Sequence, residues 1–555
     1  MNDVPQHNLA AVAEAVAQRV PDRTAIVAKG HRFTYDELNR RTRQLAHVLH
    51  DHGLGARPGG REGLASHESH QDHLAIYAYN GNEYLEAMIG AFKARVAPVN
   101  VNYRYVAEEL RYLLDNSKSK AIVYHSAFAP TLAEVRDDLP ELTLLLQIAD
   151  DSGNELLPGA LWYEEALAAA SDELPSWAGE WSPDDLYILY TGGTTGMPKG
   201  VLWRQADIFR SSMGGLNQAT GEPWETLDEV AGAAEANSLV SMPAAPFMHG
   251  AGHWIAFLGL NTGSTIVVQN VVERLDPVDI CECVEREGIQ FLQIVGDAFG
   301  RPILEEIERG NHDVSSLFIL LSGGAALTQP IKQRYFEVLP NLMIVDGLGS
   351  SEGGGQGTSM TTKDSSAEPA TFAPVAGSMV VSADLTEVLE PGHEGIGWLA
   401  KRGSAPLGYF DDAEKTARTF PVIDGVRYSV PGDRARYLAD GSFELLGRDS
   451  QTINSGGEKI FVEEVEAAIV AHPDVADAVV VGRPSQRWGS EVCAIVQMAD
   501  GKTAEIADLK ATAAEHIARY KLPRAWVFVD RVLRSPAGKA DYRWAASTAA
   551  EAPEE

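Results

Sequence analysis

The sequence predicts an α/β protein. We expect a large amino-terminal domain of layered α/β subdomains with a small β-barrel-like subdomain, and then a small mobile α+β domain. Short apolar runs alternate with amphipathic segments through residue 345, as in strand–helix–strand units. Three glycine-rich segments follow apolar runs, and after residue 370 the apolar stretches become short and are split by Gly and Pro. The 555 residues are enough for several such units.

The first elements are predicted from apolar spacing and from capping residues. Leu9, Val12 and Val16 lie on one face of a predicted helix. Thr34 and Glu37 form a capping-box pattern that opens a second helix, and a third helix is expected around residues 84–92. These helices alternate with strands, so a largely parallel sheet is expected. The strands predicted in this part are residues 24–27, 74–79 and 97–101.

A second series of units ends in two glycine-rich exits. Asp276 and Pro277 are typical of a helix start, and strands are expected at residues 264–268 and 289–295. Two further strands run into Ser-Gly-Gly-Ala-Ala at 322–326 and Asp-Gly-Leu-Gly-Ser-Ser-Glu at 346–352. Ligands in open α/β sheets bind beyond the carboxyl ends of strands, so these exits predict one composite nucleotide site.

The segment Tyr-Thr-Gly-Gly-Thr-Thr-Gly-Met-Pro-Lys-Gly at 190–200 is predicted to hold phosphate. Its glycines let backbone amides face one concavity, its threonines add hydroxyl donors, and its lysine adds a positive charge. It is not a Walker P-loop, because Met197 and Pro198 stand before the lysine. The residues expected to contact phosphate are Thr191, Gly192, Gly193, Thr194, Thr195, Gly196 and Lys199.

The rest of the chain predicts a domain boundary at 447–449, which separates a domain of residues 1–447 from one of residues 448–555. The β-barrel-like subdomain precedes this boundary. Helices at about 462–471 and 507–517 and a strand at 475–481 are expected beyond it. The Ala- and Glu-rich stretch 545–555 is expected to be a frayed tail.

Composition disfavours several classes of partner. A formal charge of −32 would repel nucleic acid and anionic membranes. No apolar run approaches the roughly 18 residues that a transmembrane segment needs.

Neither end carries a recognisable targeting motif, so a cytoplasmic location is expected. The three cysteines are too few for a disulfide framework, and Cys281 and Cys283 are expected to be packing residues.

In their order along the chain, these motifs resemble those of the adenylate-forming superfamily, which includes acyl-CoA synthetases, adenylation domains of peptide synthetases, and luciferases. The resemblance covers nearly the whole chain. It implies use of ATP, Mg²⁺ and coenzyme A: a carboxylate and ATP give an acyl-adenylate and pyrophosphate, and a thiol then releases AMP. Residues 201–204 and the insert at 67–73 further resemble actinobacterial fatty-acid or steroid side-chain CoA synthetases.

The resemblance also implies roles for individual residues. Lys539 matches the catalytic lysine of the small domain, Glu352 matches a catalytic Mg²⁺ ligand, and Asp449 matches the interdomain hinge. The further ATP-binding residues implied are Gly323, Gly324, Ala325, Asp346, Gly347, Leu348, Gly349, Ser351, Asp433 and Arg448. The CoA-binding residues implied are Ser455, Gly456, Gly457 and Glu458.

Elementary chemistry supports this division of roles. A carboxylate is already ionised at neutral pH, so its attack on the α-phosphorus needs no general base. The difficulty is to bring two anions together while pyrophosphate leaves, which calls for Mg²⁺ and positioned cations. Lys539 could stabilise the developing charge, but only when the small domain is closed.

Two positions depart from the family pattern. Leu348 stands where many relatives place a tyrosine that stacks on adenine, so base recognition is expected to use apolar contact and backbone groups. Pro431 replaces the usual threonine two residues before Asp433, which removes a hydroxyl and stiffens the turn.

The segment at 245–254 resembles the lining of the acyl side of the site. His249, Gly250 and Trp254 are therefore expected to line an acyl pocket. The segment contains no lysine or arginine to pair with an amino-acid carboxylate, so a hydrophobic acid is expected as the substrate. The length and ring structure of that acid stay open.

Alternatives also stay open at this point. The acyl group could pass to a carrier protein, or the chain could be a luciferase-like oxygenase or a non-catalytic ATP-binding module. A module of that last kind would not need Lys539 on a separate domain. His67, His70 and His73 could bind a metal, but their spacing would close a site only on a regular helix. A homodimer is expected from the habit of the family.

Overall fold

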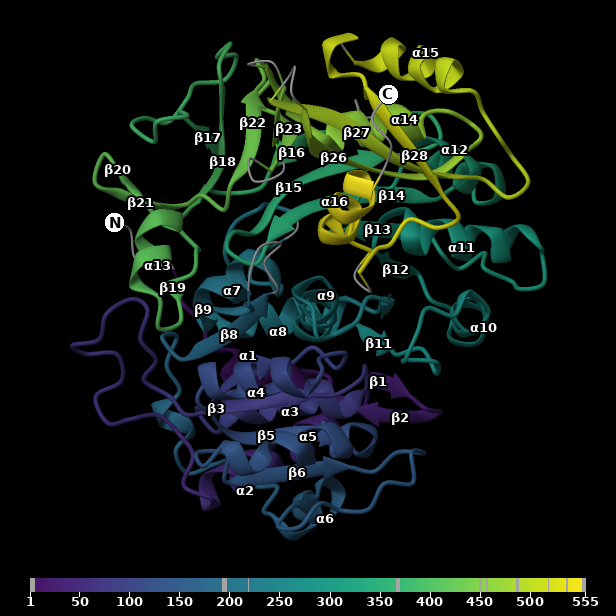
Figure 1. Cartoon of the computed structure of the whole chain (residues 1–555). Helices are drawn as coiled ribbons and strands as arrows, with labels where there is room; N and C mark the ends of the chain where they lie inside the picture. The colour runs from purple at the N-terminus through teal and green to yellow at the C-terminus, as the bar shows by residue number, and fades with distance from the viewer. Residues whose placement is uncertain are drawn as a thin grey trace.

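The computed structural model has the α/β architecture that the sequence predicts (Figure 1). An eight-stranded sheet with its helices occupies the lower half of the view, and most of a longer, 15-stranded sheet lies above it. A five-stranded sheet belongs to the carboxyl-terminal unit. The residues that the structure describes are 5–191, 197–217, 219–365, 370–448, 452–455, 458–485, 489–517, 519–535 and 538–551.

The strands of the eight-stranded sheet are, in spatial order, β19 (Gly408–Tyr409), β9 (Lys199–Arg204), β8 (Leu186–Thr191), β4 (Ala97–Asn100), β3 (His73–Tyr77), β5 (Ser119–His125), β6 (Leu144–Ile148) and β7 (Leu161–Trp162). The strands from β8 to β7 are parallel, while β9 and β19 join in antiparallel fashion. Helices cover both faces, so alternate residues of β3 enter different core clusters: Leu74 and Ile76 one, Ala75 and Tyr77 the other.

The strands of the longer sheet are, in spatial order, β2 (His31–Thr34), β1 (Thr24–Ala28), β11 (Thr265–Val267), β10 (Val240–Pro243), β12 (Phe291–Ile294), β13 (Ile319–Gly323), β14 (Met343–Ser350), β15 (Gly354–Thr361), β16 (Thr371–Pro374), β23 (Phe443–Arg448), β22 (Asp433–Tyr437), β18 (Ile396–Arg402), β21 (Val426–Ser429) and β20 (Val422–Ile423), with β17 (Ser378–Val381) paired to β18. The path from β1 to β14 is parallel. It becomes antiparallel at β15, and the β-rich segment after residue 370 continues it through β16.

Side chains cap the start of the large-domain helices that begin at Leu9, Tyr35, Leu227, Pro277 and Ala413. The Thr34 hydroxyl accepts from the Glu37 amide at 3.1 Å, and the Glu37 carboxylate accepts from the Thr34 amide at 2.8 Å, which confirms the predicted capping box. The helices are α1 (Leu9–Arg19), α2 (Tyr35–Asp51), α3 (Asn82–Lys93), α4 (Ala107–Asn116), α5 (Ala129–Val135), α6 (Tyr163–Ala169), α7 (Gln205–Ser212), α8 (Leu227–Ala236), α9 (Gly250–Asn261), α10 (Pro277–Glu287), α11 (Gly296–Glu308), α12 (Gln329–Val338) and α13 (Ala413–Thr419). Short 3₁₀ helices lie at Ser126–Phe128, Arg136–Asp138 and Ala178–Glu180.

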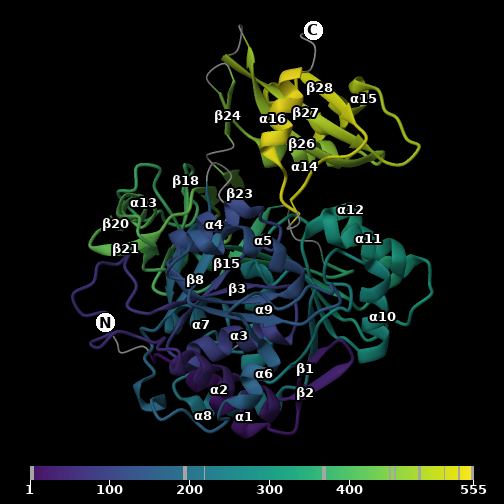
Figure 2. The same cartoon turned by 60° about the horizontal axis from the view of Figure 1, so that its bottom comes forward.

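The carboxyl-terminal unit stands apart from the large domain in the tilted view (Figure 2). Its strands are β25 (Glu458–Phe461), β24 (Thr452–Ser455), β27 (Gly489–Met498), β26 (Val475–Ser485) and β28 (Ala525–Val529). Its helices are α14 (Val462–Val470), α15 (Ile506–His516) and α16 (Tyr542–Glu551), with a 3₁₀ turn at Arg519–Lys521.

The expectation of a frayed tail from residue 545 is wrong for most of that stretch. The structure has α16 there, and Ala545 and Ala549 are buried in a core cluster that also contains Val479 and Ile495. Their spacing of four places both side chains on one helix face. The Asp541 carboxylate accepts from the Arg543 and Trp544 amides, which starts the helix.

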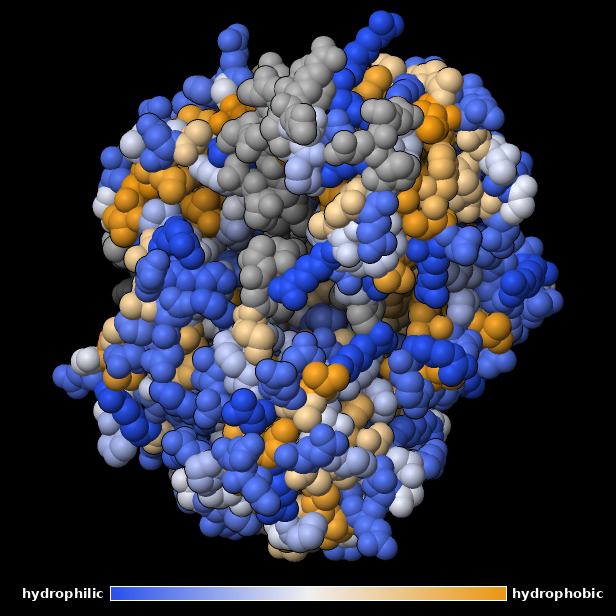
Figure 3. Space-filling view, in the orientation of Figure 1, coloured by the Kyte–Doolittle hydropathy of each residue, from blue (hydrophilic) through white to orange (hydrophobic). Residues whose placement is uncertain are grey.

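The visible face of the molecule is largely hydrophilic, with scattered hydrophobic patches, as expected for a chain of net charge −32 (Figure 3). No helix among the described residues has the length and apolar character needed to span a membrane. All three cysteines are free and buried, which agrees with a packing role for Cys281 and Cys283.

Candidate active site

Four neighbouring parallel strands end at the same edge of the longer sheet. β10 leads to His249, β12 to Val295, β13 to Gly323, and β14 to Asp346 and the residues after it. In the register of β13 and β14, Ser322 lies opposite Asp346 and Gly323 opposite Gly347. The two predicted glycine-rich exits are therefore adjacent, as a composite site requires.

The predicted phosphate loop connects β8 to β9. These strands pair in antiparallel fashion with Thr191 opposite Lys199, so the loop leaves and re-enters the sheet at one point. Thr191 and Lys199 thus stand at its two ends. Gly192, Gly193, Thr194, Thr195 and Gly196 lie outside the residues that the structure describes.

Lys199 is bound to a carboxylate that the sequence analysis missed. Its ammonium group forms an ion pair with Asp412, whose other oxygen accepts from the Lys415 amide at 2.9 Å and caps α13. Burial acts to raise the pKa of Asp412, but the hydrogen bonds from Lys199 and the Lys415 amide outweigh it and lower that pKa. The cap pattern of Asp412 was legible in the sequence, whereas its pairing with Lys199 depends on β19 lying beside β9.

Glu352 follows β14 and is held by three surrounding elements. The Tyr409 phenol donates to Glu352 Oε1 at 2.6 Å, the Ser429 hydroxyl donates to its backbone carbonyl at 2.6 Å, and the Trp203 indole donates to the neighbouring Ser351 carbonyl at 2.9 Å. Among the described residues, no donor is placed on the second carboxylate oxygen. Since Mg²⁺ is commonly held by one or two carboxylates together with substrate phosphates, this half-buried carboxylate fits a Mg²⁺ ligand.

Two of the residues predicted to bind the adenine base, Asp346 and Leu348, already contact other parts of the protein. Asp346 forms an ion pair with Lys332 at 2.5 Å, so its carboxylate is already engaged. Burial raises the pKa of Asp346, and Lys332 opposes that rise. Leu348 is half-buried and packs against the β-rich cluster that contains Phe443. Gly324, Ala325 and Gly349 lie in the same two exits.

The two predicted ribose residues occupy directly opposite backbone positions in a strand pair. Asp433 begins β22 and is buried, and Arg448 lies directly opposite it at the end of β23. The backbone register therefore brings the two positions together, while the Arg448 side chain lies outside the described part of the structure.

The predicted acyl-side residues gather at the start of α9. His249 is the residue before the helix, and its Nε2 is buried with no hydrogen-bond partner among the described residues. Burial, with a smaller effect from the positive charge of Lys539, lowers the pKa of His249 to about 3, so the ring is neutral at physiological pH. A Cβ on Gly250 would lie 3.1 Å from the Trp254 ring, so the indole rests on this glycine.

The Lys539 loop of the small domain lies on this edge of the large domain. A Cβ on Gly538 would lie 3.2 Å from Val295 Cγ1 and 3.5 Å from Ala298 Cβ. The next residue, Lys539, is exposed and close enough for its charge to act on His249. A further contact between the domains is a 3.1 Å hydrogen bond from Arg301 to the Ala476 carbonyl. The structure therefore brings the predicted catalytic lysine to the strand exits.

An ion pair that the sequence analysis missed supports the Lys539 loop. Arg534 donates to both carboxylate oxygens of Asp477, at 2.7 and 2.6 Å, and also to the Gly538 carbonyl at 3.2 Å. The Ser535 amide closes the turn on the Lys539 carbonyl at 2.6 Å. The two members of the ion pair are 57 residues apart, so no local pattern in the sequence could have indicated it.

The predicted CoA segment lies in a hairpin of the small domain. Ser455 ends β24 and pairs with Glu458, the first residue of β25. Gly456, Gly457 and the hinge residue Asp449 lie outside the described residues, as does the Glu458 side chain. In the described part of the hairpin, Ser455 also pairs with Gly489 of β27.

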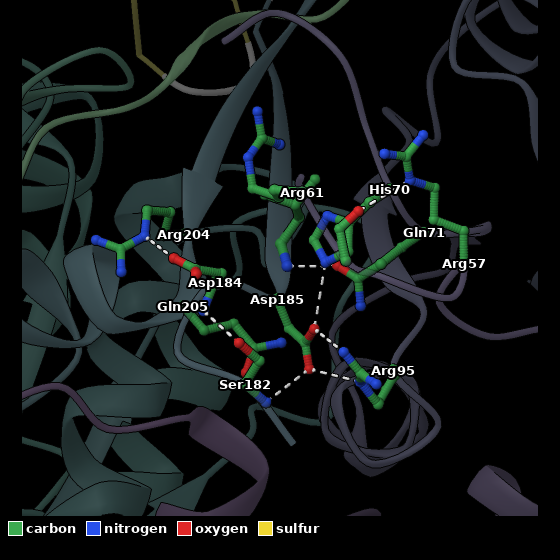
Figure 4. Close-up of polar contacts among 12 residues, drawn as sticks. Arg57, Arg61, His70, Gln71, Arg95, Ser182, Asp184, Asp185, Arg204 and Gln205 are labelled. Carbon is green, nitrogen blue, oxygen red and sulfur yellow. Dashed lines mark hydrogen bonds and ion pairs between the residues drawn. The ribbon is translucent and has the colours of Figure 1, made fainter. Parts of the chain in front are cut away.

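His70 and His73 have other partners in the described structure. Figure 4 shows His70 directed at Asp185, 3.4 Å away, and Asp185 also pairs with Arg95. His73 bonds to the Ser117 carbonyl at 2.5 Å and to the Ser69 hydroxyl at 2.8 Å. Within the described ranges, no group of three His, Cys, Asp or Glu side chains could hold a metal.

Comparison with known proteins identifies the family. The AMP-binding enzyme model matches residues 13–410, and the model of the AMP-binding enzyme C-terminal domain matches residues 464–539. The chain belongs to the AMP-binding enzyme family, which confirms the resemblance to adenylate-forming enzymes that its motifs predict.

Relatives with curated names cover almost the full chain. The chain is 55% identical to the medium-chain acyl-CoA ligase Mig of Mycobacterium avium, over 96% of this chain and 97% of that protein. It is 40% identical to a medium/long-chain-fatty-acid–CoA/3-oxocholest-4-en-26-oate–CoA ligase of Mycolicibacterium smegmatis, over 98% and 97% of the two chains. The crystal structure of the anthranilate CoA ligase AuaEII in complex with anthranoyl-AMP superposes with a TM-score of 0.81 at 21% identity, covering 98% of each chain, which supports the fold.

Proposed function

We propose that the chain is an AMP-forming acyl-CoA synthetase that activates a hydrophobic carboxylic acid with ATP and transfers the acyl group to coenzyme A. The observation that carries this proposal is the seating of the Lys539 loop on Val295, at the edge where the strand exits meet. The named relatives, which are CoA ligases of fatty and steroid acids, support the same reaction class.

In the first step, the protein's task is to manage negative charge. Thr191, Lys199 and the loop between them bind the β- and γ-phosphates. For this, Lys199 must release Asp412 and bind phosphate in its place. Lys539 stabilises charge as the carboxylate approaches the α-phosphorus. The neutral ring of His249 then forms a wall of the acyl pocket, and no general base is needed.

Glu352 is the residue that would hold Mg²⁺, with Tyr409 orienting its carboxylate. When bound, Mg²⁺ would neutralise charge on the phosphate oxygens. Asp433 and Arg448 would bind the ribose from opposite strands. The exits at Gly323 and Gly347 would receive the base.

The second step needs a different arrangement of the two domains. We propose that the small domain turns about Asp449, withdraws Lys539 and brings the hairpin containing Ser455 and Glu458 to the thiol. Between described residues of the two domains, Arg301 donates a hydrogen bond to the Ala476 carbonyl, and α14 packs near β23 beside the boundary. Domains of one chain commonly move relative to each other unless a large apolar interface joins them.

Release of AMP and pyrophosphate with a panel of acids, measured with and without CoA, tests the proposal. We expect pyrophosphate exchange with medium-chain, long-chain or steroid acids, and thioester formation only when CoA is present. Exchange without a CoA thioester would indicate a carrier protein as acceptor. Absence of exchange with every acid would contradict adenylate formation and favour the non-catalytic alternative.

Two expectations from the sequence stay predictions, namely a homodimer and a cytoplasmic location. Sedimentation of the purified chain would test the first of these, and cell fractionation the second.

A further inference from the structure

A chain of three hydrogen bonds runs beneath the predicted acyl-side wall. The Trp254 indole Nε1 donates to Tyr187 Oη at 3.0 Å. Tyr187 Oη lies 2.5 Å from His253 Nε2, and His253 Nδ1 lies 2.6 Å from the Phe247 carbonyl. The chain links α9 to β8 and to the segment before α9.

The direction of every bond in this chain is determined by its last member. The Phe247 carbonyl can only accept, so Nδ1 of His253 carries the proton and Nε2 is an acceptor. The Tyr187 phenol must therefore donate to His253, which leaves its oxygen to accept from the indole of Trp254. Each donor is used once, and the indole N–H is satisfied within the protein by Tyr187 Oη.

Burial makes these three hydrogen bonds costly to break. Tyr187 is 1% exposed and His253 is fully buried, so water cannot easily replace a lost partner. Burial also lowers the pKa of His253 to about 4, which keeps the ring in the neutral form that the bonding pattern requires. Trp254 itself is only half-buried, so part of its ring faces outward from this polar base.

Trp254 lies about one helical turn after Gly250, the first residue of α9. Gly250 and Trp254 lie on one face of α9, four residues apart, and the indole covers Gly250. Leu189 of β8 lies against the same spot, with a Cδ atom 3.2 Å from where a Gly250 Cβ would be. His249 immediately precedes this turn, and the positive charge of Lys539 contributes to the lowered pKa of His249. An acyl chain whose carboxylate lies near Lys539 and that extends along this face of α9 would meet the indole.

We infer that Tyr187 and His253 are positioning residues that hold the Trp254 indole as a fixed end wall and so limit the length of acid that binds well. This inference rests on the proposed function. An indole whose N–H donates to the buried Tyr187–His253 pair cannot swing aside at little cost, whereas an indole without the Tyr187 hydroxyl can. Neither Tyr187 nor His253 touches the acid in this account.

Tyr187→Phe tests the inference, because it removes one hydroxyl and keeps the ring. Acyl-CoA formation would be measured with hexanoate, decanoate, palmitate and a steroid side-chain acid. We expect kcat/KM for palmitate relative to hexanoate to rise about tenfold, on the scale of one lost hydrogen bond, mainly through KM for the longer acid. KM for ATP should stay unchanged.

Tyr124→Phe is the matched control. Tyr124 is a buried tyrosine of the same sheet, and its hydroxyl donates to Gln147 Oε1 at 2.7 Å, far along the chain from α9. It should lose comparable stability without changing the ratio of the two acids. A ratio that moves equally in both variants would assign the effect to general loosening and overturn the inference.

Trp254→Phe provides a second route if Tyr187→Phe does not fold. It removes the indole N–H and leaves the Tyr187–His253 pair intact, and it should also favour longer acids. In the double variant, Tyr187→Phe should add little further change, because the two residues act through one bond. Additive effects, an unchanged ratio, or a shift toward shorter acids would each overturn the inference. If the wild-type chain activates no acid, the proposed function fails first.

Discussion

The Tyr409 phenol donates a 2.6 Å hydrogen bond to the Glu352 carboxylate. Tyr409 also ends β19, which pairs with β9, the strand that begins at Lys199. Three residues later, Asp412 binds Lys199 itself. One short segment thus connects the predicted Mg²⁺ ligand to the predicted phosphate loop.

Tyr409→Phe should weaken adenylate formation without abolishing it. Loss of the phenol leaves the Glu352 carboxylate free to rotate, and removal of such an orienting partner costs about tenfold in metal affinity or activity. Pyrophosphate exchange, titrated with Mg²⁺, should show a higher half-saturating concentration. Tyr124→Phe should not shift the titration. An unchanged Mg²⁺ dependence in Tyr409→Phe would contradict the role of Tyr409 in orienting the Glu352 carboxylate.

Asp412→Asn should lower the KM for ATP by about threefold. Asparagine caps a helix nearly as well as aspartate, so α13 should stay intact while Lys199 loses its competing carboxylate. The difference should shrink at high salt, because the competition is ionic. Steady-state kinetics at two salt concentrations would check this. A KM that rises would mean that Asp412 positions Lys199 for phosphate and does not compete with it.

Asp477→Asn should impair the first step selectively. It weakens the ion pair through which Arg534 supports the Gly538 carbonyl and hence the Lys539 turn. We expect pyrophosphate exchange to fall about tenfold, as a charged hydrogen bond of this strength implies. Thioester formation from supplied acyl-adenylate should be retained. Asp474→Asn, which disrupts the exposed pair with Lys502 in the same domain, is the control, and equal losses in both variants would contradict the supporting role.

Stability should fall as the pH drops below about 6.5. Burial lowers the pKa of His73, His125 and His253 to about 4 and that of His249 to about 3. Between pH 6.5 and 4 the unfolded chain binds more protons at these sites, so each histidine removes about 2 kcal/mol of stability at pH 5. Urea unfolding at pH 7 and pH 5 would measure the loss. His125→Gln should reduce the difference, and a loss that is the same in that variant would contradict the assignment.

Local chemistry made much of the fold predictable. The capping box of Thr34 and Glu37, the alternation of strands and helices, and the two glycine exits all depend on residues close together in sequence. The tail prediction failed because the apolar pair Ala545 and Ala549 gains its helix mainly by packing on a distant sheet.

The parts of the site that the sequence did not indicate are contacts between distant residues. Tyr187 and His253 are 66 residues apart, and Tyr409 and Glu352 are 57 apart. Neither pair follows a helical or strand period, so only the tertiary arrangement brings them together. Lys539 could be assigned from its motif, but the Asp477–Arg534 ion pair behind it could not.

The most direct test of the account is to separate the two half-reactions in Lys539→Ala. Removal of the ammonium group takes away the charge that the small domain brings to the strand exits. Lys502→Ala, an exposed lysine of the same domain, is the matched control and should behave as wild type. We predict that Lys539→Ala loses pyrophosphate exchange by at least about a hundredfold, on the scale of a lost transition-state contact, while converting synthetic acyl-adenylate and CoA to thioester at nearly the wild-type rate. Equal loss of both half-reactions, or retention of exchange, would contradict it.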